Sequence, residues 1–388
     1  MPASPIRKLV PFADGAKARG THVYHLNIGQ PDVAAPESFW AAMHAARPAV
    51  LEYSHSAGIA ALRAKAAESY RAMGLPVQAD DVLVTVGGSE AVAIAMATIC
   101  DEGDEVIVPE PMYANYIGFA SGIGVKVVAL PTRIEDDFAL PDASAFAAKI
   151  TPRTRAILIC NPSNPTGTVY SREQLQALRA IALEHNLYLV SDEVYRDFVY
   201  EGDRPLSVLE LDGLEDRTVM IDSVSKRFSL CGARIGFMVC RNPNFMAAAV
   251  KFAQARLSAS TLEMMGVIGA LDAPASYFDE VREEYRRRRD LLVRRLQAMP
   301  GVRVPKIEGA FYAAVRLPID DADRFAQWLL EEFSHEGQTV MVAPLTGFYT
   351  TLGQGKDEVR IAYVLKEADL EKAMDCLQVA LQTYPGRR

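Results

Sequence analysis

Residues 156–167 read AILICNPSNPTG, an apolar run that leads directly into a turn. A run without polar positions is typical of a strand that is covered on both faces, as in a parallel sheet. The two Asn-Pro steps that follow fix an extended turn and hold Asn164 in one direction. A plain loop would tolerate many other sequences here, so we interpret the turn as functional and the run as a buried strand that ends at it.

Apolar, β-branched runs of this kind alternate with helical segments from about residue 80 to residue 240. The runs are Val82–Val86, Val106–Pro109, Val125–Leu130, Ala156–Cys160, Tyr188–Ser191, Val219–Asp222 and Ile235–Cys240. Their alternation with helices predicts an α/β fold whose large domain has a mainly parallel seven-stranded sheet flanked by helices. In such sheets ligands bind at the carboxyl ends of the strands, so we expect the functional loops there.

The pattern changes after about residue 280. One long charged helix is expected over Ser276–Met299, followed by strands around Phe311–Leu317, Thr339–Val342 and Val359–Val364 and by a last helix from Glu367. These elements predict a smaller α+β domain. Residues 1–45 are too short to fold alone and are expected to join it. The predicted division is therefore a large domain over 46–282 and a small domain made of 1–45 and 283–388.

Composition and charge exclude several classes of protein. The 41 basic and 49 acidic side chains give a net charge of −8, and the one basic cluster, Arg286 to Arg289, alternates with acids as on a solvated helix face. Nucleic acid is therefore not an expected partner. The five cysteines show no CxxC pair and no metal-ligand spacing, which favours a reduced, cytoplasmic protein without a metal. No apolar run approaches the ~18 residues that span a membrane.

Residues 84–91, VTVGGSEA, lead from a strand through two glycines into a helix. Small residues let a backbone approach an anion, Ser89 offers a hydroxyl group, and the helix N-terminus supplies free N–H groups and the positive end of a dipole. This geometry binds phosphate. Gly-Gly-Ser is also a good helix start, so the string alone does not separate the two interpretations.

Two further strings place polar side chains at the ends of buried strands. In LVSDEVY (189–195), a carboxylate and a phenol, Asp192 and Tyr195, lie three residues apart. In DSVSK (222–226), Lys226 is followed eight residues later by Arg234. Each residue has a structural alternative, since Asp192 could cap a helix, Tyr195 could belong to the core and Lys226 could be solvated. Their order along the chain is more specific than any one of them.

In this order the strings resemble the fold-type I pyridoxal-phosphate aminotransferases of class I and II, which include the aspartate aminotransferases. The resemblance covers essentially the whole chain, from NIGQP (27–31) through YSHSAG (53–58) to VRIAY (359–363). It implies a pyridoxal 5'-phosphate cofactor, amino acid and 2-oxo acid substrates, and a homodimer.

The resemblance also implies a role for each matching residue. Lys226 matches the lysine that forms a Schiff base with the cofactor and later moves the substrate's proton, which requires a primary amine. Asp192 matches the carboxylate that keeps the pyridine nitrogen protonated. Asn164 and Tyr195 match the donors to the ring's phenolic oxygen. Tyr113 matches the aromatic side chain that stacks on the ring, with a core aromatic as the alternative.

Other matches concern the phosphate, the substrate and the neighbouring subunit. The phosphate is expected to contact Gly88, Ser89, Ser223 and Arg234. Arg360 matches the arginine that clamps the substrate's α-carboxylate, because a planar guanidinium fits a planar anion. Gly29 matches a backbone contact to the same carboxylate. Tyr53 matches a residue that reaches the cofactor phosphate of the neighbouring subunit, which is why a dimer is expected.

The leading prediction is a transaminase that works in two half-reactions between an L-amino acid, with aspartate favoured, and a 2-oxo acid such as 2-oxoglutarate. Some aspartate aminotransferases of a related subgroup carry a lysine at the position of Ser89 to pair with the substrate's side-chain carboxylate, and this chain departs from that pattern. Another cation must then bind an acidic side chain. Arg256 is the candidate, with a structural ion pair at a helix end as the alternative.

Other activities use similar residues. Aromatic amino acids or prephenate remain alternative substrates, and β-eliminating lyases of the same fold share the lysine, aspartate and arginine, because fold does not settle the reaction. A transcription regulator built on this fold would need a DNA-binding module, for which 388 residues leave no space. A nicotinamide dehydrogenase fits poorly, since Gly122-Ile123-Gly124 is followed by Val127 where a third small residue is needed.

Overall fold

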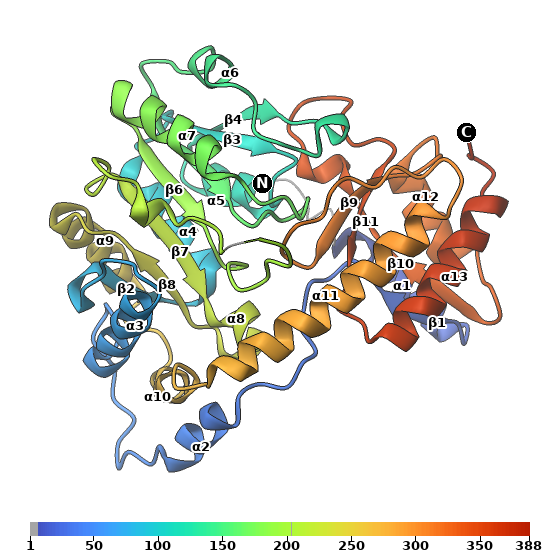
Figure 1. Ribbon diagram of the computed structural model, residues 1–388. Helices are drawn as coiled ribbons and strands as arrows, with labels where there is room; N and C mark the ends of the chain where they lie inside the picture. Colours follow the sequence, from blue (N-terminus) through green and yellow to red (C-terminus); the bar gives the residue numbers. More distant parts are fainter. Residues whose placement is uncertain (1–6, 203) are drawn as a thin grey trace.

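The computed structural model describes residues 7–202 and 204–388, and it consists of a larger and a smaller unit (Figure 1). The larger unit is built on a seven-stranded sheet with the order β2-β8-β7-β6-β5-β3-β4. Its strands are β2 (Val82–Thr85), β3 (Glu105–Glu110), β4 (Lys126–Pro131), β5 (Thr154–Cys160), β6 (Tyr188–Asp192), β7 (Thr218–Ser223) and β8 (Gly236–Val239). Strand β8 runs antiparallel to its neighbours, β2 and β7, and the other pairs of this sheet are parallel. The predicted fold class is therefore confirmed.

Helices cover both faces of this sheet because its strands are apolar on both sides. Along β5, Ile157 and Ile159 belong to one buried cluster, whereas Ala156 and Leu158 belong to another on the opposite face. Successive side chains of a strand point to opposite faces of the sheet, so helices must pack on each face to bury its apolar side chains. The surrounding helices are α3 (Ala60–Ala72), α4 (Gly87–Ile99), α5 (Asn115–Gly122), α6 (Ala143–Ala147), α7 (Arg172–Glu184), α9 (Pro243–Ala255) and α10 (Thr261–Ala270).

The smaller unit combines two short sheets with three helices. β1 (His22–His25) pairs in parallel with β10 (Gln338–Met341), and β12 (Glu358–Ala362) lies between β11 (Ala343–Pro344) and β9 (Tyr312–Arg316) in an antiparallel sheet. The helices are α1 (Val10–Ala18), α12 (Ala322–Glu331) and α13 (Glu367–Thr383). Short helices elsewhere are α8 (Val224–Arg227), η1 (Arg7–Leu9), η2 (Ala79–Asp81), η3 (Ile134–Asp136), η4 (Val208–Glu210), η5 (Cys231–Ala233) and η6 (Leu345–Phe348).

The long helix α11 (Ala275–Gln297) runs diagonally from the larger unit to the smaller one (Figure 1). The expectation of a solvated arginine cluster on this helix is only half right. Arg286 and Arg287 are partly exposed and pair with acids along the helix. Arg288 and Arg289 are buried, with 2% and 7% of their surface exposed. Because α11 packs between the units, its second face lies inside the molecule, where Arg288 pairs with Asp32.

The N-terminal segment is shared between the units. Residues 1–6 lie outside the described residues, and α1 and β1 pack with the smaller unit. Helix α2 (Glu37–Ala45) instead packs against α10, and Phe39 belongs to a core cluster of the larger sheet. Gly269 permits this approach, because a Cβ atom there would lie 2.3 Å from the carbonyl oxygen of Ser38. The described helices include none that is both long and apolar enough to cross a membrane.

Candidate active site

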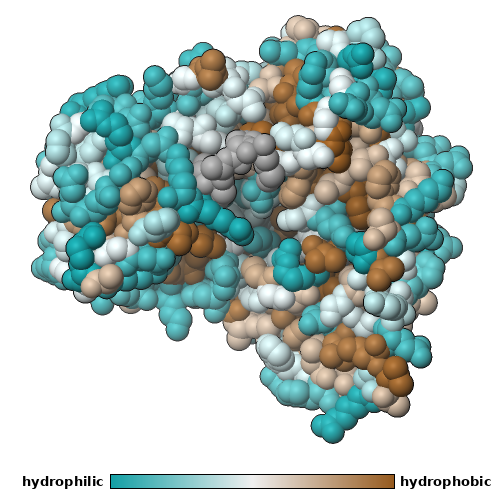
Figure 2. Space-filling model, turned by 180° about the vertical axis from the view of Figure 1, so that it is seen from behind, coloured by the Kyte–Doolittle hydropathy of each residue, from teal (hydrophilic) through white to brown (hydrophobic). Residues whose placement is uncertain are grey.

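A cavity of about 670 Å³ lies between the units, at the carboxyl ends of the parallel strands. Figure 2 shows that the surface of the molecule is hollowed between its two lobes. Eleven of the predicted site residues line this cavity: Gly29, Gly88, Ser89, Tyr113, Asn164, Asp192, Tyr195, Ser223, Lys226, Arg234 and Arg360. Side chains spread over more than 300 positions of the sequence thus meet in one place.

Asp192 is a buried carboxylate at the end of β6. Tyr116 donates a hydrogen bond from its Oη to Asp192 Oδ2 at 2.7 Å, and the backbone N–H of Val194 lies 3.4 Å from Oδ1. Burial raises the pKa of Asp192 to about 6, and the hydrogen bond from Tyr116 opposes part of that rise. A buried anion of this kind is stabilised by a cationic partner. The protonated nitrogen of a pyridine ring is such a partner.

Lys226 lies in α8, directly after β7. The N-cap residue of this helix is Ser223, whose Oγ accepts a hydrogen bond from the Ser225 N–H at 3.2 Å. The Lys226 amine donates to the carbonyl oxygen of Gly29 at 2.8 Å. Among residues 7–202 and 204–388 it forms no ion pair with a carboxylate. The amine therefore lies in the cavity at the boundary between the units.

An anion site is formed where α4 begins. Gly87 has a φ of +74°, and a Cβ atom on Gly236 would lie 2.5 Å from the Gly87 carbonyl carbon. Both positions therefore require glycine, and the backbone of the first turn of α4 stays open to a ligand. Arg234 lies beside this turn, with its Nη2 3.5 Å from the carbonyl oxygen of Val86. Helix N–H groups together with a guanidinium group suit a phosphate.

Arg360, on β12, lies at the opposite wall and is 2% exposed. It donates to Asn164 Oδ1 at 2.9 Å and to the carbonyl oxygen of Asn27 at 2.6 Å. Its guanidinium carbon lies 4.5 Å from the centre of the Tyr312 ring. Arg360 Nε and Asn27 Nδ2 are both buried and have no hydrogen-bond partner within the described part of the chain. Buried donors are normally paired, so an anionic ligand would complete this group.

Three residues of the site were not predicted from the sequence. Tyr116 supports Asp192, and Asn27 supports Arg360. Tyr312 lines the cavity, and its Oη lies 3.1 Å from Tyr195 Oη, which links the two units. A Cβ atom at Gly29 would lie 1.8 Å from Tyr312 Oη, so this contact explains the glycine. Asn27 begins the string NIGQP (27–31), but no role was predicted for it, and no quoted motif contained Tyr116 or Tyr312.

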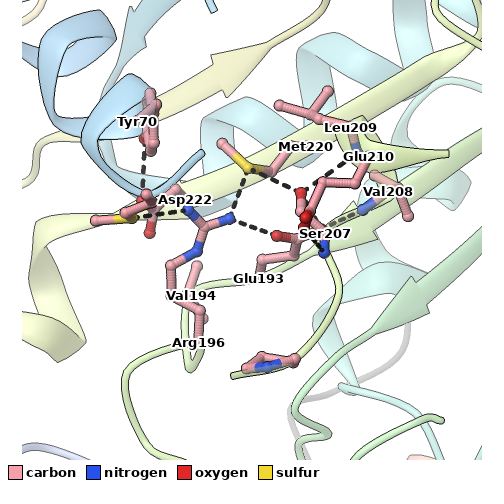
Figure 3. Close-up of polar contacts among 12 residues, drawn as sticks. Tyr70, Glu193, Val194, Arg196, Ser207, Val208, Leu209, Glu210, Met220 and Asp222 are labelled. Atoms are coloured by element: carbon pink, nitrogen blue, oxygen red, sulfur yellow. Dashed lines mark hydrogen bonds and ion pairs between the residues drawn. The ribbon is translucent and has the colours of Figure 1, made fainter. Parts of the chain in front are cut away.

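Figure 3 shows a polar network around Glu193 and Arg196, in which Glu193, Ser207 and Asp222 are buried. Arg196 forms an ion pair with Glu193, and Glu193 Oε1 accepts hydrogen bonds from Ser207 Oγ and from the backbone N–H of Val208, each at 3.0 Å. Tyr70 Oη donates to Asp222 Oδ2 at 3.0 Å. Glu193 is next to Asp192 in the chain, and Asp222 is next to Ser223. The network therefore fastens the segments that carry the catalytic candidates.

Two predicted residues do not line the cavity. Tyr53 is 82% exposed on the surface. Arg256 Nε lies 3.0 and 3.1 Å from the two carboxylate oxygens of Glu90, and its Nη2 donates to the carbonyl oxygen of Val84 at 2.7 Å. These contacts favour the structural alternative for Arg256, because they occupy the guanidinium group at the end of α9. Its binding role stays a prediction.

The fold and this set of residues define a pyridoxal-phosphate-dependent aminotransferase, and the chain belongs to the family "Aminotransferase class I and II", whose model matches residues 21–377. It is 36% identical over 371 residues to the aspartate/prephenate aminotransferase of Thermus thermophilus, covering 92% of this chain and 91% of that protein. It is 32% identical to the aspartate aminotransferase of Bacillus subtilis, with coverage of 92% and 91%.

Solved structures agree with this assignment. Aspartate aminotransferase from Thermus thermophilus with maleate superposes with a TM-score of 0.89 at 33% identity, covering 98% of this chain and 97% of that one. Alanine aminotransferase from Pyrococcus furiosus gives a TM-score of 0.89 at 30% identity, with coverage of 97% and 96%. The predicted family and cofactor are therefore confirmed.

The residues of the cavity fit this cofactor. Gly88, Ser89, Ser223 and Arg234 would hold its phosphate, and Asp192 would face its ring nitrogen. Pyridoxal phosphate, when bound, supplies a ring that withdraws electrons from the substrate's Cα and so eases loss of the Cα proton. The buried carboxylate of Asp192 would maintain the positive charge on the ring nitrogen that this withdrawal needs.

Proposed function

We propose that this aminotransferase moves the amino group of an L-amino acid, with aspartate favoured, to a 2-oxo acid such as 2-oxoglutarate in two half-reactions. One observation carries the proposal: a primary amine, a buried carboxylate and a buried guanidinium group line the same cavity, as Lys226, Asp192 and Arg360. These groups are what proton transfer at Cα and binding of an α-carboxylate require.

The contacts of these residues support a division of roles. Lys226 takes and returns the proton of the substrate's Cα, since its amine is held at Gly29 between the two units. Arg360 orients the substrate through its α-carboxylate, and the ring of Tyr312 keeps the guanidinium plane in place. Asn164 contacts both the residue that would bind the substrate and a residue that would bind the cofactor. Its Oδ1 accepts a hydrogen bond from Arg360, and its Nδ2 lies 3.4 Å from Tyr195 Oη.

Aspartate is favoured by the names of the relatives, and an aromatic amino acid or prephenate is the second candidate. Relatives include the aspartate/prephenate aminotransferase of Thermus thermophilus and an aromatic-amino-acid aminotransferase of Thermococcus litoralis. The apolar side chains of Val92 and Phe119 also line the cavity and would pack against a ring. The names of these relatives do not support a β-eliminating lyase, because they are aminotransferase names.

A panel of amino donors with 2-oxoglutarate, compared by kcat/KM, tests the substrate. Aspartate should exceed phenylalanine and alanine, and equal values would remove the aspartate assignment. Lys226→Ala should lose nearly all turnover together with the visible absorbance of the bound cofactor. The control is Lys251→Ala, at an exposed lysine of α9. Full activity in Lys226→Ala would refute the catalytic role.

We also infer that the enzyme acts as a homodimer in the cytoplasm. Tyr53 is accompanied by exposed apolar neighbours, Val50 at 70% and Leu51 at 57%, and Trp40 on α2 is 45% exposed. Figure 2 shows hydrophobic atoms on the lobe that carries α2. A second subunit would cover such residues. Light scattering should give twice the chain mass, and Leu51→Glu should lower it. The free cysteines support a reducing compartment.

A further inference from the structure

Glu110 is a buried acidic residue that has no part in the site described so far. It ends β3 of the larger unit, and 0% of its surface is exposed. Its Oε2 accepts hydrogen bonds from the backbone N–H groups of Thr350 at 2.8 Å and Thr351 at 3.4 Å, and from Thr350 Oγ1 at 3.3 Å. One carboxyl group thus fastens a loop of the smaller unit to the large sheet.

The second carboxyl oxygen of Glu110 makes this contact costly. Glu110 Oε1 is also buried and has no hydrogen-bond partner within the described part of the chain. A buried polar atom without a partner costs free energy, whereas an apolar side chain of similar size avoids that cost. Stability alone therefore does not explain an acid at this position.

The loop that Glu110 holds follows Phe348, which contacts Arg360. Phe348 is the last residue of η6 and is buried, and its ring centre lies 5.0 Å from the guanidinium carbon of Arg360. Tyr312 places a second ring 4.5 Å from the same carbon. Aromatic rings attract a guanidinium group and restrict its orientation. A shift of Phe348 would therefore change how the Arg360 plane is held.

A second hydrogen bond joins the same two segments. The backbone N–H of Met112 donates to the carbonyl oxygen of Phe348 at 2.8 Å. Met112 follows Glu110 by two residues and directly precedes Tyr113, which lines the cavity. Residues 110–113 therefore connect the wall that carries Arg360 with the wall that would hold the cofactor.

We propose that Glu110 is a positioning residue for recognition of the substrate's α-carboxylate. It holds residues 348–351, so that Phe348 keeps Arg360 in the orientation that binds this carboxylate. The proposal rests on the proposed function, because it assumes an amino acid held by Arg360. Glu110 is not part of the cavity lining, so it acts through the loop. Its loss should weaken recognition of the α-carboxylate and leave binding of the cofactor unchanged.

The test compares the holoenzymes of the wild type, Glu110→Met, Glu110→Gln and the matched control Glu105→Met, at the other end of β3. The first half-reaction is followed by the absorbance of the cofactor, with aspartate and with its α-amide, isoasparagine. Glu110→Met should lower kcat/KM for aspartate about 3- to 10-fold, the cost of one hydrogen bond, and change that for isoasparagine by less than about twofold. Glu110→Gln should lose less, because its amide oxygen still accepts, and Glu105→Met should lose nothing.

Two further measurements separate this role from a merely structural one. Calorimetry should give the same affinity for pyridoxal phosphate in all four proteins. In a double-mutant cycle, Phe348→Leu should also weaken the reaction with aspartate, and adding Glu110→Met should then lower it by less than about twofold, because both changes act on one contact. If Glu110→Met does not fold, Glu110→Gln decides by the same ratio of aspartate to isoasparagine.

The outcomes distinguish this proposal from the proposed function. A wild type that transaminates no amino acid, or that reacts equally with aspartate and isoasparagine, would refute the proposed function or its α-carboxylate clamp. A wild type that discriminates between them, together with Glu110 variants that keep this discrimination, would overturn only the role of Glu110. Additive losses from Glu110→Met and Phe348→Leu would also overturn it, because Glu110 would then not act through Phe348.

Discussion

Asp192→Asn should make the cofactor-free protein more stable at neutral pH and less able to bind its cofactor. Burial raises the pKa of Asp192 from 3.8 to about 6. A folded-state pKa above the unfolded value means that the stabilising contribution of this carboxyl group is complete below about pH 4 and is lost as the pH rises through 6. A shift of about two pH units corresponds to about 3 kcal/mol. Asparagine carries no charge and avoids this loss, and its amide oxygen can still accept from Tyr116.

Urea unfolding of the cofactor-free wild type and variant, at pH values from 4.5 to 8, measures the effect. The difference in the free energy of unfolding should be small at the acidic end and approach about 3 kcal/mol in favour of the Asp192→Asn variant above pH 7. Cofactor affinity should change in the other direction, by about tenfold or more, because a charge-assisted hydrogen bond is lost. A stability difference that does not vary with pH, or a less stable variant at pH 8, would contradict the reasoning.

Three further substitutions test other parts of the site. Arg360→Ala should lower kcat/KM for every amino acid by about 10- to 100-fold, since a charge-assisted contact is worth about 1.5–3 kcal/mol, and unchanged values would refute the clamp. Arg196→Met leaves the buried Glu193 without its cation and should cost about 3–5 kcal/mol of stability in a denaturation experiment. Tyr312→Phe removes only the hydroxyl group beside Tyr195, so kcat should fall by less than about tenfold with little change in melting temperature.

The fold and most of the cavity were predictable because they depend on local patterns. Each strand of the large sheet is a short apolar run, and the residues that match the cofactor contacts directly follow such a run, as Asp192 ends β6 and Asn164 follows β5. Parallel strands bring their carboxyl ends to one edge, so the order of the strings was enough to group these side chains.

The remaining parts depend on packing between distant segments, which no local pattern records. Tyr312 comes from an ordinary strand of the smaller unit and becomes a site residue only where that unit meets Tyr195. Arg288 has the sequence surroundings of a solvated arginine but lies between the units, beside Asp32. In the same way, α2 joins the larger unit through a contact with α10 that separates it from α1.

The two walls of the cavity come from different cores, and this has a consequence for how such enzymes diverge. The groups that match the cofactor, including Asp192 and Lys226, belong to the seven-stranded unit, whereas Tyr312 and Arg360 belong to the other unit. Mutations in the core of the smaller unit can therefore change which acids are accepted. The residues of the seven-stranded unit that match the cofactor are then inherited unchanged. A lineage can then acquire a new substrate without passing through an ancestor that has lost its cofactor.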